Sequence, residues 1–516
     1  MTPRPESPSH QMLAKAAADW LRSHAPAAQL CGDSRSIAPG DVFVAYSGKT
    51  GDGRQHIAQA VERGAAAVLC EQSEAFQWDA RIPVAHYLVP ELHAVAGLIA
   101  SLWYAQPDAG MFTVAVTGTN GKTSCTQWLG QALSRDGLPT AVIGTLGIGL
   151  FQQGLAGKFE TTGYTTPDAV QLQRNLAQLS QRGAKAVAIE ASSIGLEQGR
   201  MQGMHIDVAL FTNLTRDHLD YHGDMAAYEA AKSRLFDWPG LRHAVINLDD
   251  PMGLRLLAPL RQRMPQTTVT GYTITGVRVE GIHTLAATDI RLGQHGTVFQ
   301  LIAPFGAGQV RTQLVGHFNV SNVLAIASVL LARGISWQKL VLLLESLVAV
   351  PGRMQQLGGI EAPLVVIDYA HTPDALEKTL HSLRQVASER HGKLWCVFGC
   401  GGDRDPGKRP QMGAVAAKAD HLIVTSDNPR SEEPTAIIEQ IVAGIDTDKT
   451  AQTQVIADRA SAILFAVKHA AKQDVVLVAG KGHEDYQEIK GRRVDFLDAD
   501  HTALALATRA TRHGCH

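Results

Sequence analysis

One short run constrains the fold of this 516-residue chain more than any other. Residues 112–116 are mostly apolar and β-branched, and they stop at the turn Gly118-Thr119-Asn120-Gly121, which Lys122 and Thr123 follow. We expect a strand, a tight turn and then a helix over residues 125–133. Such a turn directs several backbone N–H groups at one point, and the start of the helix adds partial positive charge there. The run therefore predicts a site for a nucleoside triphosphate.

The loop differs in length from the common phosphate-binding loop. That loop has four residues between its first glycine and the Gly-Lys pair, whereas only Thr119 and Asn120 separate Gly118 from Gly121 here. A chance glycine turn is the alternative, but a strand before it and a helix after it favour a nucleotide loop. Lys122 is then expected to neutralise the outer phosphates, and the Thr123 hydroxyl to hold Mg²⁺.

Composition excludes several classes of protein. The chain is 45% hydrophobic and 19% charged with a net charge of −2, which suits a globular protein and disfavours a general binder of nucleic acid or membrane surfaces. Its six cysteines show no CxxC spacing, so we expect reduced thiols. The N-terminus lacks an apolar leader, and no run of about 18 apolar residues occurs. These features predict a cytoplasmic enzyme without membrane insertion.

A chain of this length suggests about three domains, and we place them at residues 1–108, 109–350 and 351–516. Continuous apolar runs alternate with helical patterns, as in strands that are covered on both faces of a parallel sheet. The expected strands of the second and third domains are residues 140–144, 186–190, 208–213, 243–247, 364–368, 394–399, 421–426 and 475–480. The predicted fold class is α/β, with a central P-loop ATPase-like parallel sheet and a C-terminal Rossmann-like domain. In that last domain Arg404 replaces the final glycine of a GxGxxG motif, so we expect no dinucleotide there.

Polar residues follow two of the central strands. Glu190 ends the run 186–190, where a carboxylate beside a phosphate-binding loop suits Mg²⁺, although a solvated glutamate is the simpler interpretation. Asp217, His218, Asp220 and His222 fall within six residues after another apolar run. They fit a metal or phosphate site, a metal-dependent hydrolase, or an ordinary polar loop, and the cluster alone does not decide among these.

Lys232 has apolar neighbours at helical spacing. Tyr228, Leu235 and Phe236 would lie on its face of a helix. A buried ammonium group is costly and can lose its proton, and a neutral amine can react with CO₂ to give a carbamate that binds metal. From the spacing alone, a lysine that extends its ammonium group to solvent is favoured.

Taken together, the motifs make the chain resemble the Mur ligases, the ATP-dependent amide-forming enzymes of peptidoglycan precursor synthesis. The resemblance covers nearly the whole chain, and within the family it is greatest to members that add meso-diaminopimelate. Members that add lysine are the nearest alternative, and a P-loop hydrolase or nucleotide switch is the alternative from another class. The motifs that carry the resemblance are residues 33–35, 118–123, 190–193, 217–222, 229–232, 318–322, 368–374, 427–430 and 480–487.

The resemblance implies a role for each matching residue. The ATP contacts are Gly118, Thr119, Asn120, Gly121, Lys122, Thr123, Ser124, Asn319, Arg353 and Asp368. The Mg²⁺ sites are formed by Thr123, Glu190, His218 and a carbamylated Lys232, and the catalytic residues are Lys122, His218 and Lys232. The contacts to UDP-N-acetylmuramoyl-L-alanyl-D-glutamate are Ser34, Lys49, Thr50, Gly51, Tyr164, Thr165, Thr166, Ser192, Gln198 and Arg200. The contacts to meso-diaminopimelate are Arg404, Asp427, Asn428, Pro429, Arg430, Gly480 and Glu484.

Two positions depart from the family pattern. Ile194 stands where many relatives have histidine, and Tyr164 stands where asparagine is common, which affects the substrate contacts at these points. The implied reaction is unchanged: a substrate carboxylate attacks the γ-phosphate of ATP, and an amine then displaces phosphate from the acyl phosphate. We expect a monomer that binds no nucleic acid, with each substrate held by its own domain.

Overall fold

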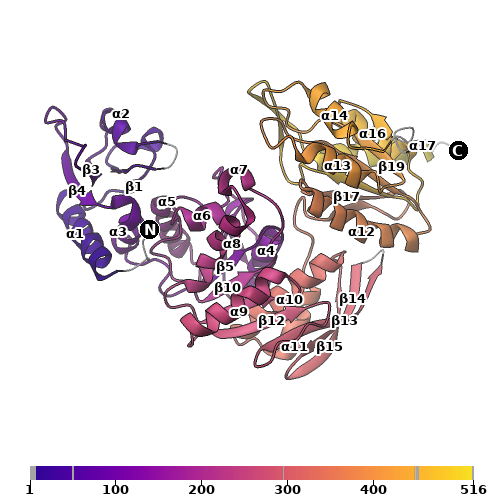
Figure 1. The fold of residues 1–516 in the computed structure, drawn as a ribbon, viewed down its shortest axis with the longest axis horizontal. Coiled ribbons are helices and arrows are strands. Elements are labelled where there is room, and N and C mark those ends of the chain that lie inside the picture. Colours follow the sequence, from indigo (N-terminus) through magenta and orange to yellow (C-terminus); the bar gives the residue numbers. More distant parts are fainter. Residues whose placement is uncertain (1–6, 49–50, 294–295, 447, 449–452, 514–516) are drawn as a thin grey trace.

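The chain folds into three α/β units that follow one another along the sequence (Figure 1). This computed structural model describes residues 7–48, 51–293, 296–446, 448 and 453–513. The central unit lies between the other two, and the N- and C-terminal units occupy opposite ends of the molecule (Figure 1). The α/β class is therefore as predicted, while the domain bounds at residues 108 and 350 remain predictions.

The first unit is a four-stranded parallel sheet in the order β1-β2-β3-β4. Its strands are β1 (Leu30–Cys31), β2 (Val42–Ala45), β3 (Ala67–Gln72) and β4 (Ala85–Pro90), and its helices are α1 (Pro8–His24), α2 (Ile57–Glu62) and α3 (Leu92–Trp103). Helix α3 packs against α5 (Ala169–Gln181) of the central unit. That contact brings the tip of β1 to the central unit, where a methyl group on Gly32 would lie 3.6 Å from a carboxylate oxygen of Asp168.

The central unit is an eleven-stranded sheet in the order β15-β14-β13-β12-β11-β10-β5-β9-β6-β7-β8. Strand β5 (Phe112–Thr117) pairs in parallel with β9 and β10. The other strands are β6 (Thr140–Gly144), β7 (Gly147–Gln152), β8 (Leu155–Ala156), β9 (Ala186–Glu190), β10 (Val208–Phe211), β11 (His243–Asn247), β12 (Thr268–Thr273), β13 (His283–Gly293), β14 (Gly296–Ala303) and β15 (Gly306–Thr312). The helices are α4 (Lys122–Arg135), α5, α6 (Ser193–Glu197), α7 (Leu219–His222), α8 (Met225–Ser233), α9 (Pro251–Arg263), α10 (His317–Ala332) and α11 (Trp337–Glu345).

This sheet differs from the prediction at its two edges. Strands β7, β8, β14 and β15 run antiparallel to their neighbours, so the sheet is parallel only from β13 to β6. The connections explain the difference, because the turn between β6 and β7 is far too short for the crossover that a parallel pair requires. The parallel part is buried on both faces, as expected: Val114 and Val116 of β5 join one apolar cluster, and Ala115 joins the other.

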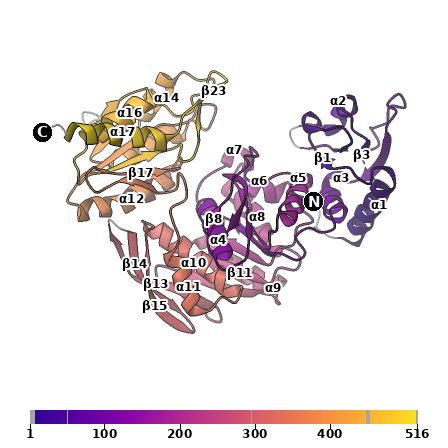
Figure 2. The ribbon, with the colours of Figure 1, turned by 180° about the vertical axis from the view of Figure 1, so that it is seen from behind.

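The third unit is a six-stranded sheet in the order β16-β17-β21-β18-β19-β20, parallel except for β16. Its strands are β16 (Gln355–Gly358), β17 (Leu364–Asp368), β18 (Leu394–Phe398), β19 (His421–Val424), β20 (Thr453–Val455) and β21 (Val475–Ala479), with a hairpin β22 (Tyr486–Ile489) and β23 (Arg492–Asp495). Helices α12 (Pro373–Glu389), α13 (Lys408–Ala416) and α14 (Pro434–Val442) cover one face. Helices α16 (Arg459–His469) and α17 (Asp498–His513) lie on the other, seen from behind in Figure 2.

The eight strands expected from the sequence are all present, and several end one or two residues earlier than predicted. Their carboxyl ends place polar loops at one edge of each parallel sheet, where ligands bind in folds of this kind. Within the described residues, no helix has the length and apolar character needed to cross a membrane.

Candidate active site

The glycine loop has the predicted geometry. Strand β5 ends at Thr117 and helix α4 begins at Lys122. Gly118 has φ 147°, and a methyl group there would lie 1.9 Å from the Thr212 hydroxyl oxygen, so only glycine fits this position. The tip of β10 fixes the rest of the loop: the Asn213 carbonyl accepts the Thr119 N–H at 2.8 Å, and its side-chain oxygen accepts the Asn120 N–H at 2.9 Å.

Two lysines meet on the inner side of this loop. Lys122 Nζ donates to the carbonyls of Gly118 at 2.8 Å and Thr119 at 2.7 Å. Lys232 Nζ donates to the same Gly118 carbonyl at 2.7 Å and lies 4.4 Å from the centre of the Tyr228 ring. Because Lys232 is only 1% exposed, the interpretation from spacing alone, a lysine that reaches solvent, is wrong.

The surroundings of the two amines disfavour two charges. Burial lowers the pKa of Lys232 well below its usual value, the charge of Lys122 lowers it further, and Asp217 acts in the opposite direction. Burial also lowers the pKa of Lys122, but Glu190 and Asp217 oppose that shift. Lys232 is therefore the amine that loses its proton first, which leaves it nucleophilic. Helix α8 ends at Ser233 and a 3₁₀ turn follows, so Leu235 and Phe236 do not continue the helical face.

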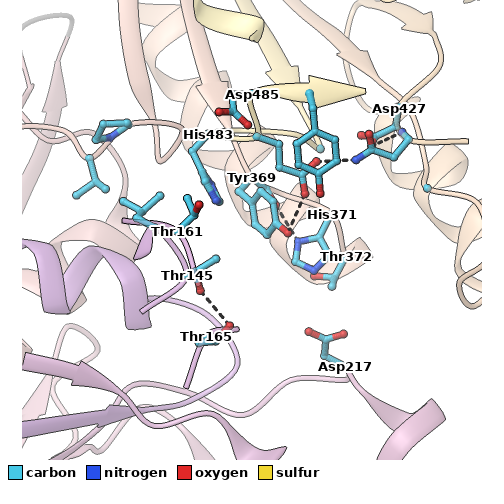
Figure 3. Close-up of a pocket in the computed structure, with 18 of the residues that line it drawn as sticks. Thr145, Thr161, Thr165, Asp217, Tyr369, His371, Thr372, Asp427, His483 and Asp485 are labelled. Atoms are coloured by element: carbon cyan, nitrogen blue, oxygen red, sulfur yellow. Dashed lines mark hydrogen bonds between the residues drawn. The ribbon is translucent and has the colours of Figure 1, made fainter. Parts of the chain in front are cut away.

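Glu190 is buried rather than solvated. Its side chain is 1% exposed at the end of β9, and its two oxygens accept the Thr145 N–H at 2.9 Å and the Thr145 hydroxyl at 3.1 Å. The Thr145 hydroxyl also lies 3.2 Å from the Thr165 hydroxyl (Figure 3). A buried carboxylate next to the phosphate loop, with lone pairs remaining, is chemically suited to a divalent cation.

The Asp217–His222 segment splits into two parts. His218 has φ 53° and precedes α7, and its Nε2 lies 3.5 Å from Asp217 Oδ2. Burial lowers the pKa of His218 although Asp217 raises it, so a neutral imidazole faces the lysines. His222 turns away to the Ser193 hydroxyl, 2.9 Å from its Nε2. No three histidine, cysteine, aspartate or glutamate side chains gather into a metal site in the described part of the chain.

Arg353 connects the third unit to the phosphate loop. Its Nη2 donates to the Thr123 hydroxyl at 3.4 Å, and its guanidinium lies 4.3 Å from the centre of the Tyr369 ring. Asp368, at the end of β17, accepts the Met354 N–H at 2.9 Å; burial raises the pKa of this carboxyl, and Arg353 opposes the shift. Asn319 lies in the first turn of α10 and donates to the Val315 carbonyl at 2.8 Å.

Several predicted substrate contacts gather beyond the end of β9. The Thr166 hydroxyl donates to the Glu190 carbonyl at 2.7 Å and lies 2.9 Å from the Ser192 hydroxyl. Arg200 donates to the Thr166 carbonyl and to the Gln198 side chain, both at 2.9 Å. Thr166, Ser192, Gln198 and Arg200 therefore form one hydrogen-bonded group, and their predicted contacts to the substrate stay predictions.

The two departures from the family pattern lie close to this group. Tyr164 is 56% exposed, and its ring lies 5.1 Å beneath the Arg200 guanidinium. Ile194 lies in α6, directly after Ser193. Tyr164 therefore offers an aromatic face and a cation contact where relatives offer an amide.

In the first unit, Ser34 is buried, and its hydroxyl donates to Gln59 Oε1 at 2.8 Å. Gly51, the last residue of the predicted substrate-binding run 49–51, is exposed. Lys49 and Thr50 lie outside the described residues, so their predicted contacts stay predictions.

The predicted contacts of the third unit lie at three neighbouring strand ends. Arg404 follows β18, the run 427–430 follows β19, and Gly480 and Glu484 follow β21. Arg430 has φ 51° and donates to the Gly402 carbonyl at 2.6 Å.

One neighbouring carboxylate, that of Glu488, pairs with the Arg430 guanidinium. Glu488 lies 3.9 Å from it, while Glu432 pairs with Arg409 and Glu433 pairs with Lys490. The alternative to a ligand-binding Arg430 is an arginine that only bonds a neighbouring loop carboxylate; the carboxylate that pairs with it is that of Glu488, and not that of Glu432 or Glu433.

A cleft of about 1410 Å³ separates the central and third units. Thr165, Asp217 and His218 line its central wall, and the opposite wall carries Arg404, Asp427, Asn428, Arg430, Gly480 and Glu484. Figure 3 shows Asp217, Thr145 and Thr165 on one side, facing Tyr369, His371 and Asp427 on the other. The predicted contacts to meso-diaminopimelate and the polar loops beside the phosphate loop thus line the same cleft.

The sequence analysis predicts no role for three residues with aromatic rings in this cleft: Tyr369, His371 and His483. Tyr369 lies 4.7 Å from His371 and 5.2 Å from His483 between ring centres. Burial lowers the pKa of His371 to about 4 and of His483 to about 3, so both rings are neutral near pH 7. Tyr369 and His371 belong to the motif at 368–374, and His483 belongs to the motif at 480–487. Both motifs place polar residues directly after an apolar strand, and this pattern was the sequence signal that could have identified the three residues.

Comparison with known proteins agrees with this architecture. Three family descriptions match in order along the chain: "Mur ligase family, catalytic domain" over residues 29–104, "Mur ligase middle domain" over 116–330, and "Mur ligase, glutamate ligase domain" over 352–482. These descriptions cover most of the chain and all three units.

Individual proteins are similar over nearly the full length. A UDP-N-acetylmuramoyl-L-alanyl-D-glutamate--2,6-diaminopimelate ligase from Janthinobacterium sp. is 66% identical over 95% of this chain and 96% of the relative, and one from Ralstonia nicotianae is 53% identical over 95% of each. A solved structure of a ligase with the same name superposes with a TM-score of 0.66 at 36% identity, covering 93% of this chain and 95% of that one. The chain belongs to the Mur ligase family.

Proposed function

We propose that this protein is an ATP-dependent amide ligase that joins meso-diaminopimelate to UDP-N-acetylmuramoyl-L-alanyl-D-glutamate. One observation carries the proposal: the polar loops next to the lysine-lined phosphate loop face the Arg430 guanidinium across a single cleft, and Arg430 has only a long contact of 3.9 Å to Glu488 among the described ion pairs. The names of relatives that are 66% and 53% identical supply the identity of the substrates. Cytoplasmic location and a monomeric state belong to the same proposal.

Residues of the central and the third unit together form the proposed nucleotide site. The N–H groups at the start of α4 receive the phosphates of ATP, and Lys122 exchanges its backbone carbonyl partners for the outer phosphate oxygens. Arg353 already contacts Thr123 beside that position. Asn319 and Asp368 are assigned to the nucleoside, since they lie at the start of α10 and the end of β17.

The residues present fit Mg²⁺. The Thr123 hydroxyl and the Glu190 carboxylate offer hard oxygen donors, and a carbamate on Lys232 adds two more oxygens. The neutral imidazole of His218 completes the candidate set. When bound, the ion supplies positive charge next to the transferring phosphoryl group.

The reaction runs through an acyl phosphate. The free carboxylate of the UDP-linked substrate attacks the γ-phosphorus of ATP, forming a C–O–P linkage and releasing ADP. The neutral amine of diaminopimelate then attacks the acyl carbon, and phosphate leaves as the amide forms. Lys122 stabilises the negative charge on the phosphoryl oxygens in both steps, in surroundings where burial strengthens electrostatic contacts.

The two substrates that are joined bind to different units of the protein. The group formed by Thr166, Ser192, Gln198 and Arg200 places the acyl end of the UDP-linked substrate, and Ser34 with the loop that ends at Gly51 holds its nucleotide end. Across the cleft, Arg430 binds the distal carboxylate of diaminopimelate with its planar fork. Glu484 faces the distal ammonium group.

A panel of amino acids tests the proposal. Phosphate release and product mass are measured with ATP, UDP-N-acetylmuramoyl-L-alanyl-D-glutamate and each amino acid in turn. We expect product with meso-diaminopimelate and far less with lysine. Equal use of lysine points to the lysine-adding activity, and ATP hydrolysis that needs neither co-substrate points to a nucleotide switch.

A further inference from the structure

Lys481 is a fully buried lysine directly behind the wall of the cleft. It follows Gly480 at the end of β21, and its side chain is 0% exposed. Its ammonium group donates to Asn428 Oδ1 at 3.3 Å, to Glu484 Oε2 at 3.1 Å and to the Tyr486 carbonyl. An ammonium group has three N–H donors. All three are used inside the protein, so Lys481 has none left for a ligand.

The partners of Lys481 are the residues that face the cleft. Glu484 and Asn428 both line it. Glu484 Oε2 also accepts the Asn428 amide N–H at 2.7 Å, and its other oxygen accepts the Tyr369 hydroxyl at 3.4 Å. Two of these three contacts hold the same oxygen from behind. The rotamer of Glu484 is therefore set by Lys481 and Asn428 together.

Asn428 depends on Lys481 in turn. Its Oδ1 accepts from Lys481 Nζ and from the Glu488 N–H at 2.9 Å. With both acceptor positions filled in this way, the amide N–H₂ group is directed at Glu484. Removing the ammonium group leaves a buried amide oxygen and a carboxylate each short of one partner, which costs more than the average hydrogen bond contributes.

Arg430 has anchors of its own. Its side chain donates to the Gly402 carbonyl at 2.6 Å, and its backbone pairs with β22 through the Glu488 carbonyl at 2.9 Å and the Lys490 N–H at 2.7 Å. Lys481 contacts none of these Arg430 groups in the described hydrogen bonds. Loss of Lys481 is therefore expected to disturb Glu484 more than Arg430.

We propose that Lys481 is a positioning residue that fixes the Glu484 carboxylate for the second ammonium group of a diamino acid. This inference rests on the proposed function, because it assumes that the cleft binds meso-diaminopimelate. It adds a division of the pocket into two parts: Arg430 selects the distal carboxylate, and the Lys481–Asn428–Glu484 group selects the distal ammonium.

Two amine substrates separate positioning from a role in folding. Meso-diaminopimelate carries the distal ammonium group, and 2-aminopimelate lacks it but keeps the distal carboxylate. Values of kcat and KM are measured for both with the full-length wild type, Lys481→Met, Glu484→Gln and the double variant. Lys472→Met is the matched control, because Lys472 lies in the same unit, exposed, and pairs only with Glu361 in the described ion pairs.

We expect Lys481→Met to lower kcat/KM for meso-diaminopimelate by about 10- to 100-fold, the range for a lost hydrogen bond to a charged group. The kcat/KM of Lys481→Met for 2-aminopimelate should change little, and its KM for ATP should also change little. The preference of Lys481→Met for meso-diaminopimelate over 2-aminopimelate should fall to the preference that Glu484→Gln shows. The double variant should resemble Glu484→Gln alone, because both changes remove one shared interaction. Lys472→Met should behave as wild type.

Other results overturn the inference. An equal loss for both amines means that Lys481 supports the fold of the pocket in general, and so does a double variant whose losses multiply. Glu484→Gln with an unchanged preference leaves Lys481 nothing to position. If thermal melting shows that neither Lys481→Met nor Lys481→Gln folds, then the role of Lys481 is structural. Absence of product from wild type with meso-diaminopimelate is a different outcome, since it rejects the proposed function itself.

Discussion

The side-chain amines of Lys122 and Lys232 donate to one backbone carbonyl, that of Gly118, at 2.8 and 2.7 Å. Two ammonium groups this close, one buried and the other half-buried, disfavour each other's charge. Glu190 and Asp217 favour the charge on Lys122, whereas Lys122 itself disfavours the charge on Lys232. The arrangement thus makes one lysine a cation for phosphate and the other a neutral amine.

The neutral amine predicts a modification. Lys232 should react with CO₂ and carry a carbamate in the active enzyme, so Lys232→Ala should be nearly inactive. Short-chain carboxylates should restore part of the activity, because they replace the missing oxygen ligands. Mass spectrometry at preserved CO₂ pressure and assays with added acetate check this. Full activity of a protein whose Lys232 is shown to be unmodified would contradict it.

Lys122→Ala should lower kcat by roughly a hundred- to thousand-fold, since removing one preorganised electrostatic contact to the transferring group has effects of that size. The thermal melting temperature should change little or rise, because desolvation disfavours the charge of this half-buried lysine. Lys185→Ala serves as control, since Lys185 is exposed at the start of β9. Near-normal ligation by Lys122→Ala would exclude the glycine loop as the ATP site.

Gly352 should tolerate no side chain. It has φ 67°, and a methyl group would lie 2.1 Å from the His483 backbone nitrogen. Gly352→Ala must shift Arg353 or the loop at His483, and a misplacement of about 1 Å costs on the order of 100-fold in rate.

The control for this change is Gly240→Ala. Gly240 has φ 77° with nothing within 4 Å of the added methyl group, so it shares the backbone strain without the clash. Steady-state rates of the two variants should differ strongly. Similar rates would show that the contact between Gly352 and the 482–483 loop is unimportant.

Arg430→Ala should lose the ability to distinguish meso-diaminopimelate from lysine. An unpaired charged partner costs on the order of 2–5 kcal/mol, which corresponds to roughly thirty- to several-thousand-fold preference in the wild type. Competition between the two amino acids measures it, with Arg492→Ala of the exposed β23 as control. A preference that survives in Arg430→Ala would assign the selection to another residue.

The His205–Asp207 pair predicts a pH dependence of stability. A hydrogen bond of 3.0 Å to Asp207 raises the pKa of His205 above its usual 6.5, with a smaller contribution from Asp108 and opposition from Arg242. A raised pKa stabilises the fold fully below the unfolded value and loses that effect as pH rises through the folded value. The difference in melting temperature between wild type and His205→Ala should be larger at about pH 5.5 than at about pH 9. A difference in melting temperature that does not change with pH would contradict a stabilising His205–Asp207 pair.

Local features of the fold were predictable from the sequence. The strand–turn–helix around Gly118 follows from residue types within a dozen positions, and the parallel strands follow from their apolar runs. Strands β13, β14 and β15, at one edge of the central sheet, were missed. They lie in a region of mixed polarity, for example Thr288, Asp289 and Arg291 within β13, where the burial pattern is set by neighbours that are distant in sequence.

The sequence predicts candidate residues for the site, but it does not predict their contacts with one another. Arg353 reaches Thr123 across 230 positions, and Lys232 shares Gly118 with Lys122 across 114. No local spacing encodes such pairs, because the packing of whole units determines them. Burial also reversed one local interpretation, since Lys232 is 1% exposed although its spacing favoured a lysine that reaches solvent. Glu190 is likewise 1% exposed, which excludes its solvated alternative.

The central claim is that ATP activates a substrate carboxylate in this cleft. Oxygen-18 in the free carboxylate of UDP-N-acetylmuramoyl-L-alanyl-D-glutamate tests it directly, with mass spectrometry of the phosphate released during ligation to meso-diaminopimelate. An acyl phosphate transfers one carboxylate oxygen to each phosphate, so the account predicts one labelled oxygen per phosphate and per amide formed. Unlabelled phosphate, or phosphate released without amide, would contradict it.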